Sequence, residues 1–164
     1  MRVIESLDAL RGLIGQEVAV SDWVEITQQQ VNQFAEATGD RQWIHVDVER
    51  ARRESPFGAP VAHGFLTLSL LPALMQSALD MPDVKMGVNY GLNKVRFPAP
   101  APVPVGSRLR ARVSLLEMEM LPPLQPSPDA PALTGAQMTW GVTIECEGQA
   151  RPVCVAESIS RRYS

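Results

Sequence analysis

One stretch of the chain, from Gly64 to Leu79, constrains the fold most because it is apolar on nearly every side. Its length suits a helix, and a helix without a polar face must be buried on most sides. Pro72 lies in its interior, where it removes a backbone donor, so we expect a kink there. Thr67, Ser69 and Gln76 interrupt the apolar run, which therefore falls short of a membrane span.

Strand patterns account for most of the remaining chain. Arginine alternates with apolar residues over 108–113, and a similar alternation runs over 137–146. Further strands are predicted over 16–26, 85–97 and 153–159. One buried helix followed by antiparallel strands predicts the α+β class. We expect a single domain, residues 1–164, in which a curved antiparallel β-sheet wraps a long central helix.

A single sheet covers only one side of a helix that is apolar all round. We therefore expect a second copy of the chain to cover the rest, in a homodimer. Residues 121–131 contain five prolines and are predicted to form an exposed loop outside this core.

A well-marked helix start precedes the candidate site. Thr27 followed by Gln30 fits a capping box, and apolar residues then follow at helical spacing. Gly39 comes where a left-handed residue usually ends a helix. Asp40 is therefore expected to be the first residue past the helix. The backbone there is irregular, so the direction of its side chain is not fixed by helix geometry.

Asp40 and His45 raise the question of chemistry, because the chain has only two histidines. A helix would turn the chain by about 500° between them, so their side chains would point apart. A strand would separate them by roughly 16 Å on opposite faces. Only an irregular turn can join them as an acid–base pair. The second histidine, His63, precedes Gly64 at the start of the apolar helix, where unpaired N–H groups can stabilise an oxyanion.

Composition and charge exclude several classes of function. The net charge of −3 and a pI near 5.4 argue against a nucleic-acid partner. The N-terminal residues include acids and no apolar signal core, which predicts a cytoplasmic protein. Cys146 and Cys154 are expected to be free thiols in the core. Their spacing from the histidines matches no zinc motif, so we expect no metal.

The candidate residues belong to a longer motif. The run Thr38-Gly39-Asp40-Arg41-Gln42-Trp43-Ile44-His45 is similar to the signature of the MaoC-like dehydratases, hotdog-superfamily proteins that include the (R)-specific enoyl-CoA hydratases. The resemblance continues through Ala62-His63-Gly64-Phe65 and residues 90–98, and is nearest to the branch of nodulation protein N-like proteins. Gln42 and Trp43 stand where the signature has Asn and Pro, which affects substrate preference more than reaction type.

This resemblance implies a hotdog fold and the reversible addition of water to a trans-2-enoyl thioester, giving an (R)-3-hydroxyacyl product. Asp40 is implied as the general base and His45 as the residue that holds the water. The backbone N–H of Gly64 is implied as the oxyanion donor. The implied reaction needs no cofactor and no metal.

Three further residues are predicted to contact or frame the substrate. They are His63, Asn89 and Phe65. His63 is also a candidate to support the loop that places the Gly64 donor. The substrate is expected to be an acyl-CoA or an acyl carrier protein thioester.

Two alternatives stay open at this point. A hotdog thioesterase would also use a carboxylate and a water. A non-catalytic acyl-thioester-binding partner subunit would need neither acid–base residue, and the presence of both Asp40 and His45 speaks against it.

Overall fold

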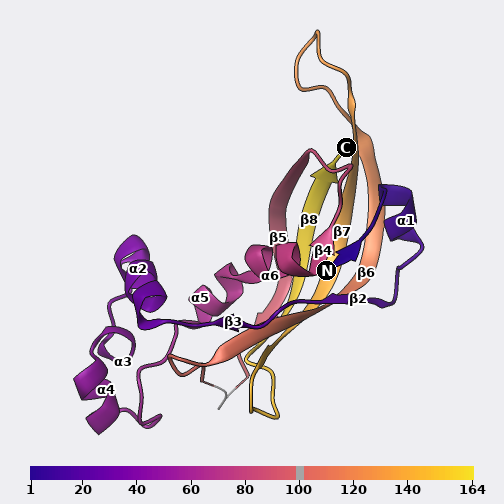
Figure 1. The fold of residues 1–164 in the computed structure, drawn as a ribbon. Helices are drawn as coiled ribbons and strands as arrows, with labels where there is room; N and C mark the ends of the chain where they lie inside the picture. The colour runs from indigo at the N-terminus through magenta and orange to yellow at the C-terminus, as the bar shows by residue number, and fades with distance from the viewer. Residues whose placement is uncertain (99–101) are drawn as a thin grey trace.

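The computed structural model describes residues 1–98 and 102–164. An antiparallel sheet in the order β2–β6–β7–β8–β5 curves around a helical segment made of α5 and α6, and β3 also pairs with β6 (Figure 1). The α+β architecture expected from the sequence is therefore confirmed.

The strands and helices have the following bounds. The strands are β1 (Arg2–Val3), β2 (Glu17–Val20), β3 (Val24–Glu25), β4 (Leu79–Asp80), β5 (Met86–Arg96), β6 (Arg108–Leu124), β7 (Leu133–Cys146) and β8 (Cys154–Tyr163). The helices are α1 (Leu7–Arg11), α2 (Gln28–Thr38), α3 (Trp43–Val46), α4 (Val48–Glu54), α5 (Gly64–Ser69) and α6 (Leu71–Ala78).

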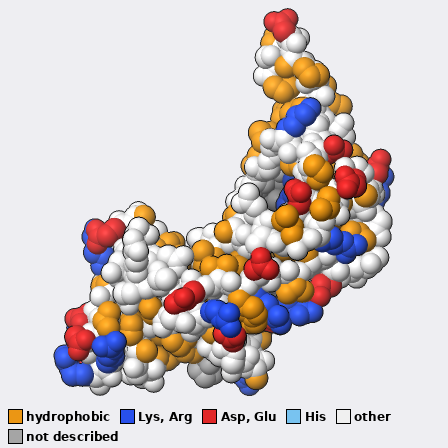
Figure 2. All heavy atoms as spheres, in the orientation of Figure 1, with side chains coloured by type: hydrophobic (Ala, Val, Ile, Leu, Met, Phe, Trp, Pro, Cys, Tyr) orange, Lys and Arg blue, Asp and Glu red, His pale blue; other side chains and the backbone are white. Residues whose placement is uncertain are grey.

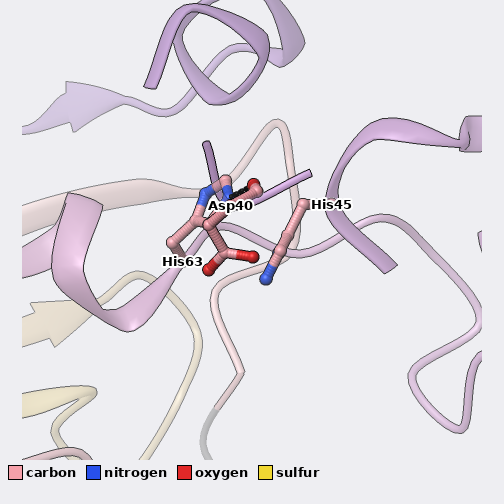
Figure 3. Close-up of side chains that lie close together, drawn as sticks. All are labelled: Asp40, His45 and His63. Atoms are coloured by element: carbon pink, nitrogen blue, oxygen red, sulfur yellow. Dashed lines mark hydrogen bonds between the residues drawn. The ribbon is translucent and has the colours of Figure 1, made fainter. Parts of the chain in front are cut away.

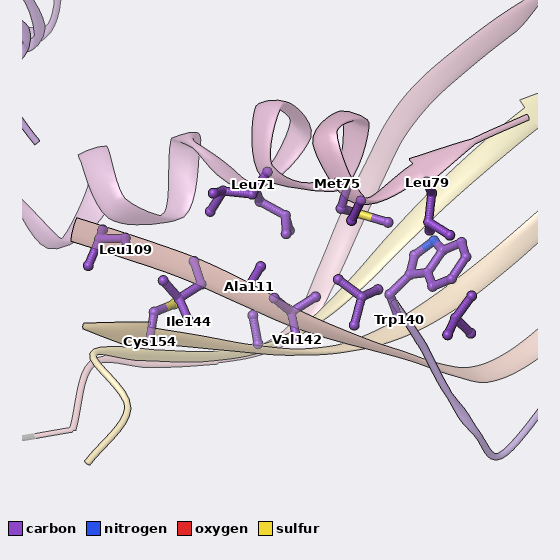
Figure 4. Packing of buried hydrophobic residues seen from close by; sticks show 14 of the residues in the cluster. Leu71, Met75, Leu79, Leu109, Ala111, Trp140, Val142, Ile144 and Cys154 are labelled. Atoms are coloured by element: carbon purple, nitrogen blue, oxygen red, sulfur yellow. The ribbon is translucent and has the colours of Figure 1, made fainter. Parts of the chain in front are cut away.

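The core lies between α6 and the middle of the sheet (Figure 4). Trp140 and Ile144, which lie on the same face of the central strand β7, are both fully buried. Leu71 and Met75 of α6 belong to the same buried cluster. The alternation predicted for this strand is confirmed, because every second side chain from Met138 to Cys146 is buried.

The predicted single helix from Gly64 to Leu79 is wrong in two respects. It is divided into α5 and α6, which meet at Leu70, and Leu79 already begins β4. Pro72 is the second residue of α6, where the backbone donor that it lacks has no partner within the helix. The expected kink thus takes the form of a break. One side of this segment is open in the single chain, and Phe65 is 68% exposed.

Two other predicted boundaries need correction. The strand expected over 16–26 is divided into β2 and β3. The loop expected over 121–131 begins later, because β6 continues to Leu124, which pairs with Leu133 of β7. The prolines at 122 and 123 are accommodated where the register of this ladder shifts. The remaining residues of that loop are mostly exposed, as predicted.

An extension formed by α2, α3 and α4 lies away from the sheet, beside the start of α5, and gives the molecule its bent outline (Figures 1 and 2). Backbone hydrogen bonds hold the loop between α4 and α5 in place. The Val61 N–H donates to the Ile44 carbonyl, and the Ala62 N–H donates to the Val103 carbonyl.

The structure also bears on the predictions about a membrane span and about the two cysteines. No helix among residues 1–98 and 102–164 is long and apolar enough to cross a membrane. Cys146 and Cys154 are free and buried, as predicted, and burial raises the pKa of the Cys154 thiol to about 11.

Candidate active site

Asp40 lies directly after α2, as its sequence predicts. The capping box is formed, since Thr27 accepts from the Gln30 N–H and the Gln30 side chain accepts from the Thr27 N–H. Gly39 ends the helix at a φ of 80°, in the left-handed region that glycine adopts without strain. The Asp40 residue is exposed, and its carboxylate makes no hydrogen bond to any residue that the structure describes.

His45 lies on α3, a single helical turn that the sequence did not predict. Its ring is buried, and Nδ1 donates to the Val61 carbonyl at 2.6 Å. A carbonyl only accepts, so Nδ1 carries the proton and Nε2 keeps its lone pair in the neutral ring. Burial lowers the pKa of His45 below its usual 6.5 and outweighs the opposing hydrogen bond to Val61. The ring is therefore neutral at neutral pH, with Nε2 as an acceptor.

His63 supports both of these residues. Its ring is 2% exposed and stacks on His45, with ring centroids 3.8 Å apart. Its Nε2 donates to the backbone carbonyl of Asp40 at 2.9 Å. Phe34 packs against the ring with its centroid 4.9 Å away. These contacts fit the supporting role considered for His63, whereas contact with substrate stays a prediction.

The turn brings the three side chains together (Figure 3). A carboxylate oxygen of Asp40 and one ring nitrogen from each of His45 and His63 lie within 4.8 Å of one another. Asp40 and His45 thus face each other across a space that a bridging water can occupy. Such a water donates one hydrogen to each residue and turns a lone pair outward, which is the arrangement that general base catalysis of water addition requires.

This protonation state predicts an acidic limb in the pH profile. Protonated His45 has no acceptor at Nε2, so we expect the kcat/KM of water addition to fall as the pH decreases, with an apparent pKa below 6.5. Stopped-flow rates measured across the acidic range give this value. A limb at or above pH 6.5, or one that persists unchanged in His45→Gln, would contradict the assignment.

The backbone N–H of Gly64 is a free donor beside this pair. Gly64 is the first residue of α5, and no residue that the structure describes accepts a hydrogen bond from its N–H. A Cβ at this position would lie 3.2 Å from the ring of Phe97. Glycine therefore lets the Phe97 ring pack closely here, and Gly64 directly follows the histidine that contacts Asp40.

A groove runs along the helical segment from Leu68, near the end of α5, onward. Two adjoining cavities of about 370 and 360 Å³ share the lining residues Leu71, Pro72, Asn89 and Ser158. Asn89 lines both cavities, and its contact with substrate stays a prediction. Phe65 lines neither of these two cavities and packs edge to face against Phe97 with centroids 6.1 Å apart. Its role in substrate binding is a prediction.

Asp40, His45 and His63 also have the donor types of a metal site. Hydrogen bonds to backbone carbonyls occupy Nδ1 of His45 and Nε2 of His63. Only the other nitrogen of each ring would be available to an ion. The expected reaction needs none, and the absence of a metal remains an expectation from the sequence.

Some contributing residues carry no sequence signal. The Val61 carbonyl fixes the His45 ring, and the Gln28 side chain donates to the His45 carbonyl at 2.8 Å. Both contacts join residues sixteen or seventeen positions apart, so no local pattern reveals them.

A curved sheet around a helical segment, with an Asp–His pair beside the start of that segment, defines a hotdog domain. The chain belongs to the MaoC-like family: the model of the MaoC like domain matches residues 10–121.

Similar proteins agree with this assignment. The 3-hydroxyacyl-thioester dehydratase Z of Mycobacterium tuberculosis is 53% identical over 161 residues, which is 98% of each chain. Nodulation protein N of Rhizobium leguminosarum bv. viciae is 44% identical and covers 94% of this chain and 89% of its own. The predicted family and its nodulation protein N-like branch are confirmed.

A solved structure supports the fold. The structure of an (R)-hydratase from A. caviae matches with a TM-score of 0.65 at 22% identity, over 90% of this chain and 94% of that one. At this identity the match concerns the fold alone, and it confirms the hotdog prediction.

Proposed function

We propose that the protein is a hydro-lyase that interconverts a trans-2-enoyl thioester and an (R)-3-hydroxyacyl thioester. The observation that carries the proposal is that an Asp40 carboxylate oxygen and a ring nitrogen of His45 lie within 4.8 Å of each other, near a backbone N–H of Gly64 that donates to no described residue. The 53% identity to a 3-hydroxyacyl-thioester dehydratase over nearly the whole chain supports the reaction class.

The mechanism begins with a water that donates to Asp40 and His45. The water oxygen forms a bond to C3, one of its protons passes to Asp40, and the π electrons of the C2–C3 bond move toward the thioester oxygen. Asp40 then returns the proton to C2 as the carbonyl re-forms. His45 is unsuited to this last transfer, because its Nε2 carries no proton in the neutral ring.

The negative charge on the thioester oxygen needs a donor. The N–H of Gly64 supplies it in this proposal, and a fixed donor of this kind typically contributes about 10²–10³ in rate. Asn89 is proposed to line the acyl groove, and Phe65 is proposed to lie at the open side of this groove. His63 is proposed to hold the turn that carries Asp40. The acyl carrier is coenzyme A, and an acyl carrier protein thioester is the alternative.

The test is a direct assay of hydration. Loss of the conjugated absorbance of crotonyl-CoA and of a longer trans-2-enoyl-CoA would support the proposal, and a crotonyl acyl carrier protein tests the alternative carrier. Thioesterase action would instead release a free thiol, which a thiol reagent detects. No loss of absorbance with any of these substrates would favour the thioesterase or the non-catalytic binding protein.

A homodimer is part of the proposal, and strand β5 is the proposed contact. It is an edge strand of eleven residues with one side of its backbone unpaired. Four of its apolar side chains are between 39% and 56% exposed: Met86, Val88, Tyr90 and Leu92. A second copy pairing along this edge would continue the sheet and cover the open side of α5, including Phe65.

We expect light scattering to give twice the chain mass of 18.0 kDa. Val88→Lys together with Leu92→Lys should produce a folded monomer, because two buried charges disfavour the pairing. Glu119→Lys on β6 is a matched control. A monomeric wild-type protein would contradict the proposed dimer.

A cytoplasmic location completes the proposal, supported by two buried thiols that remain unpaired.

A further inference from the structure

The groove along the helical segment ends beside a half-buried cation, Arg162. Its first cavity is lined by Leu68 and Ser69, the last two residues of α5, which lie about 6–8 Å along the helix from Gly64. Its second cavity continues between α6, β5 and β8 and is lined by Arg162. Helical rise places the middle of this second cavity roughly 15–20 Å beyond Gly64. The distal part of a long acyl chain would therefore come to lie beside Arg162.

Arg162 differs from the arginines that form ion pairs on the surface. Seven arginines among the described residues pair with a glutamate, and Arg162 is not one of them. Its hydrogen-bond contact is the sulfur of Met81, at 3.0 Å from Nη1. The ring of Trp140 lies 5.9 Å from its guanidinium carbon. Burial lowers the pKa of Arg162, and the guanidinium is nonetheless fully protonated at neutral pH.

The surroundings of Arg162 provide further polar groups. Ser158 and Ser160 lie on the same face of β8 and line the same cavity. Asp80 also lines it, but its residue is exposed and forms no ion pair with Arg162. A partly desolvated guanidinium with free donors is costly unless a ligand supplies acceptors. A carboxylate matches the planar fork of arginine with two parallel hydrogen bonds.

We propose that Arg162, with Ser158 and Ser160, binds a carboxylate at the far end of the acyl chain, so that the preferred substrates are long ω-carboxylated acyl thioesters. This inference rests on the proposed hydratase function and names its substrate class. Short acyl chains do not reach Arg162, so the preference depends on chain length.

The test compares two series of trans-2-enoyl-CoAs that end either in a methyl group or in a carboxylate. The series run from crotonyl-CoA and glutaconyl-CoA to the dodecenoyl and hexadecenoyl members. We expect the wild-type kcat/KM to favour the carboxylated substrate by about tenfold or more among the long members, as hydrogen bonds to a charged group do. No preference is expected among the shortest members.

Variants at Arg162 give the matched comparison. Arg162→Met should remove the preference for the long carboxylated substrates while leaving crotonyl-CoA turnover unchanged, and Arg162→Lys should retain part of it. Arg161→Met is the control, because Arg161 lies on the other face of β8, where it contacts Tyr90 and Gln137. This control should keep the wild-type preference.

The outcomes separate the two proposals. Turnover of crotonyl-CoA without a carboxylate preference on any long chain overturns the role of Arg162 and leaves the hydratase function standing. A preference that survives in Arg162→Met also overturns it. Failure of the wild-type protein to hydrate any member of either series overturns both.

Discussion

The Asp40→Asn variant is expected to fold normally and to lose hydratase activity by about 10²–10⁴. The change replaces one carboxylate oxygen with an amide nitrogen and removes the base. The fold should tolerate it, since the Asp40 carboxylate forms no hydrogen bond with the described residues. The backbone carbonyl that His63 holds is unaffected. The loss should appear in the kcat for crotonyl-CoA, with an unchanged circular dichroism spectrum.

Asp47→Asn is a matched control in the same extension. Asp47 caps α4 by accepting from the Arg50 N–H, and asparagine caps helices about equally well. We expect its activity and stability to stay close to those of the wild-type protein. Equal activity of Asp40→Asn and Asp47→Asn would contradict the role of Asp40 as the base.

His45→Gln should lose activity in the same range, because the second acceptor for the water is displaced. If both residues act on one water, the double variant should be little worse than either single variant. His45→Gln should also cost stability, on the order of 1–3 kcal/mol, if the Val61 carbonyl loses its partner. Urea unfolding separates this cost from the catalytic loss. Multiplying effects in the double variant would indicate that the two residues act in separate steps.

The parts of the site that the sequence predicts are those with short-range signals. The capping box and Gly39 place Asp40 within one residue, because both act through neighbouring backbone groups. The alternation in β7 predicts its buried face for the same reason. The spacing of Asp40 and His45 could exclude regular geometry, but it could not show that they meet. That result depends on Val61 and His63, which are distant in sequence.

The errors have a common origin in longer-range packing. Apolar content alone suggests one helix from Gly64 to Leu79, whereas Leu79 begins β4 and pairs with Arg2 of β1 in a separate two-stranded sheet. Prolines 122 and 123 suggest a loop, whereas the ladder with β7 continues past them to Leu124. Tertiary contacts outweigh local preference at each of these positions.

The backbone donor of Gly64 can be tested by a substitution that removes only its hydrogen. Gly64 is the first residue of α5, a position where proline fits because its fixed φ suits the helix and no internal hydrogen bond is lost. His63 has a ψ of 140°, the extended conformation that a residue before proline requires. Gly64→Pro should therefore keep the turn and remove the donor.

Gly64→Ala is the matched control, because it adds a Cβ near Phe97 and keeps the N–H. Both variants add a Cβ that displaces the Phe97 ring by a few tenths of an ångström, so this part of the steric cost is shared between them. We expect Gly64→Pro to have a kcat for crotonyl-CoA about 10²–10³ lower than Gly64→Ala, as loss of one oxyanion donor predicts. Two folded variants with equal kcat would show that another group stabilises the thioester oxygen, and would leave Gly64 with a packing role against Phe97.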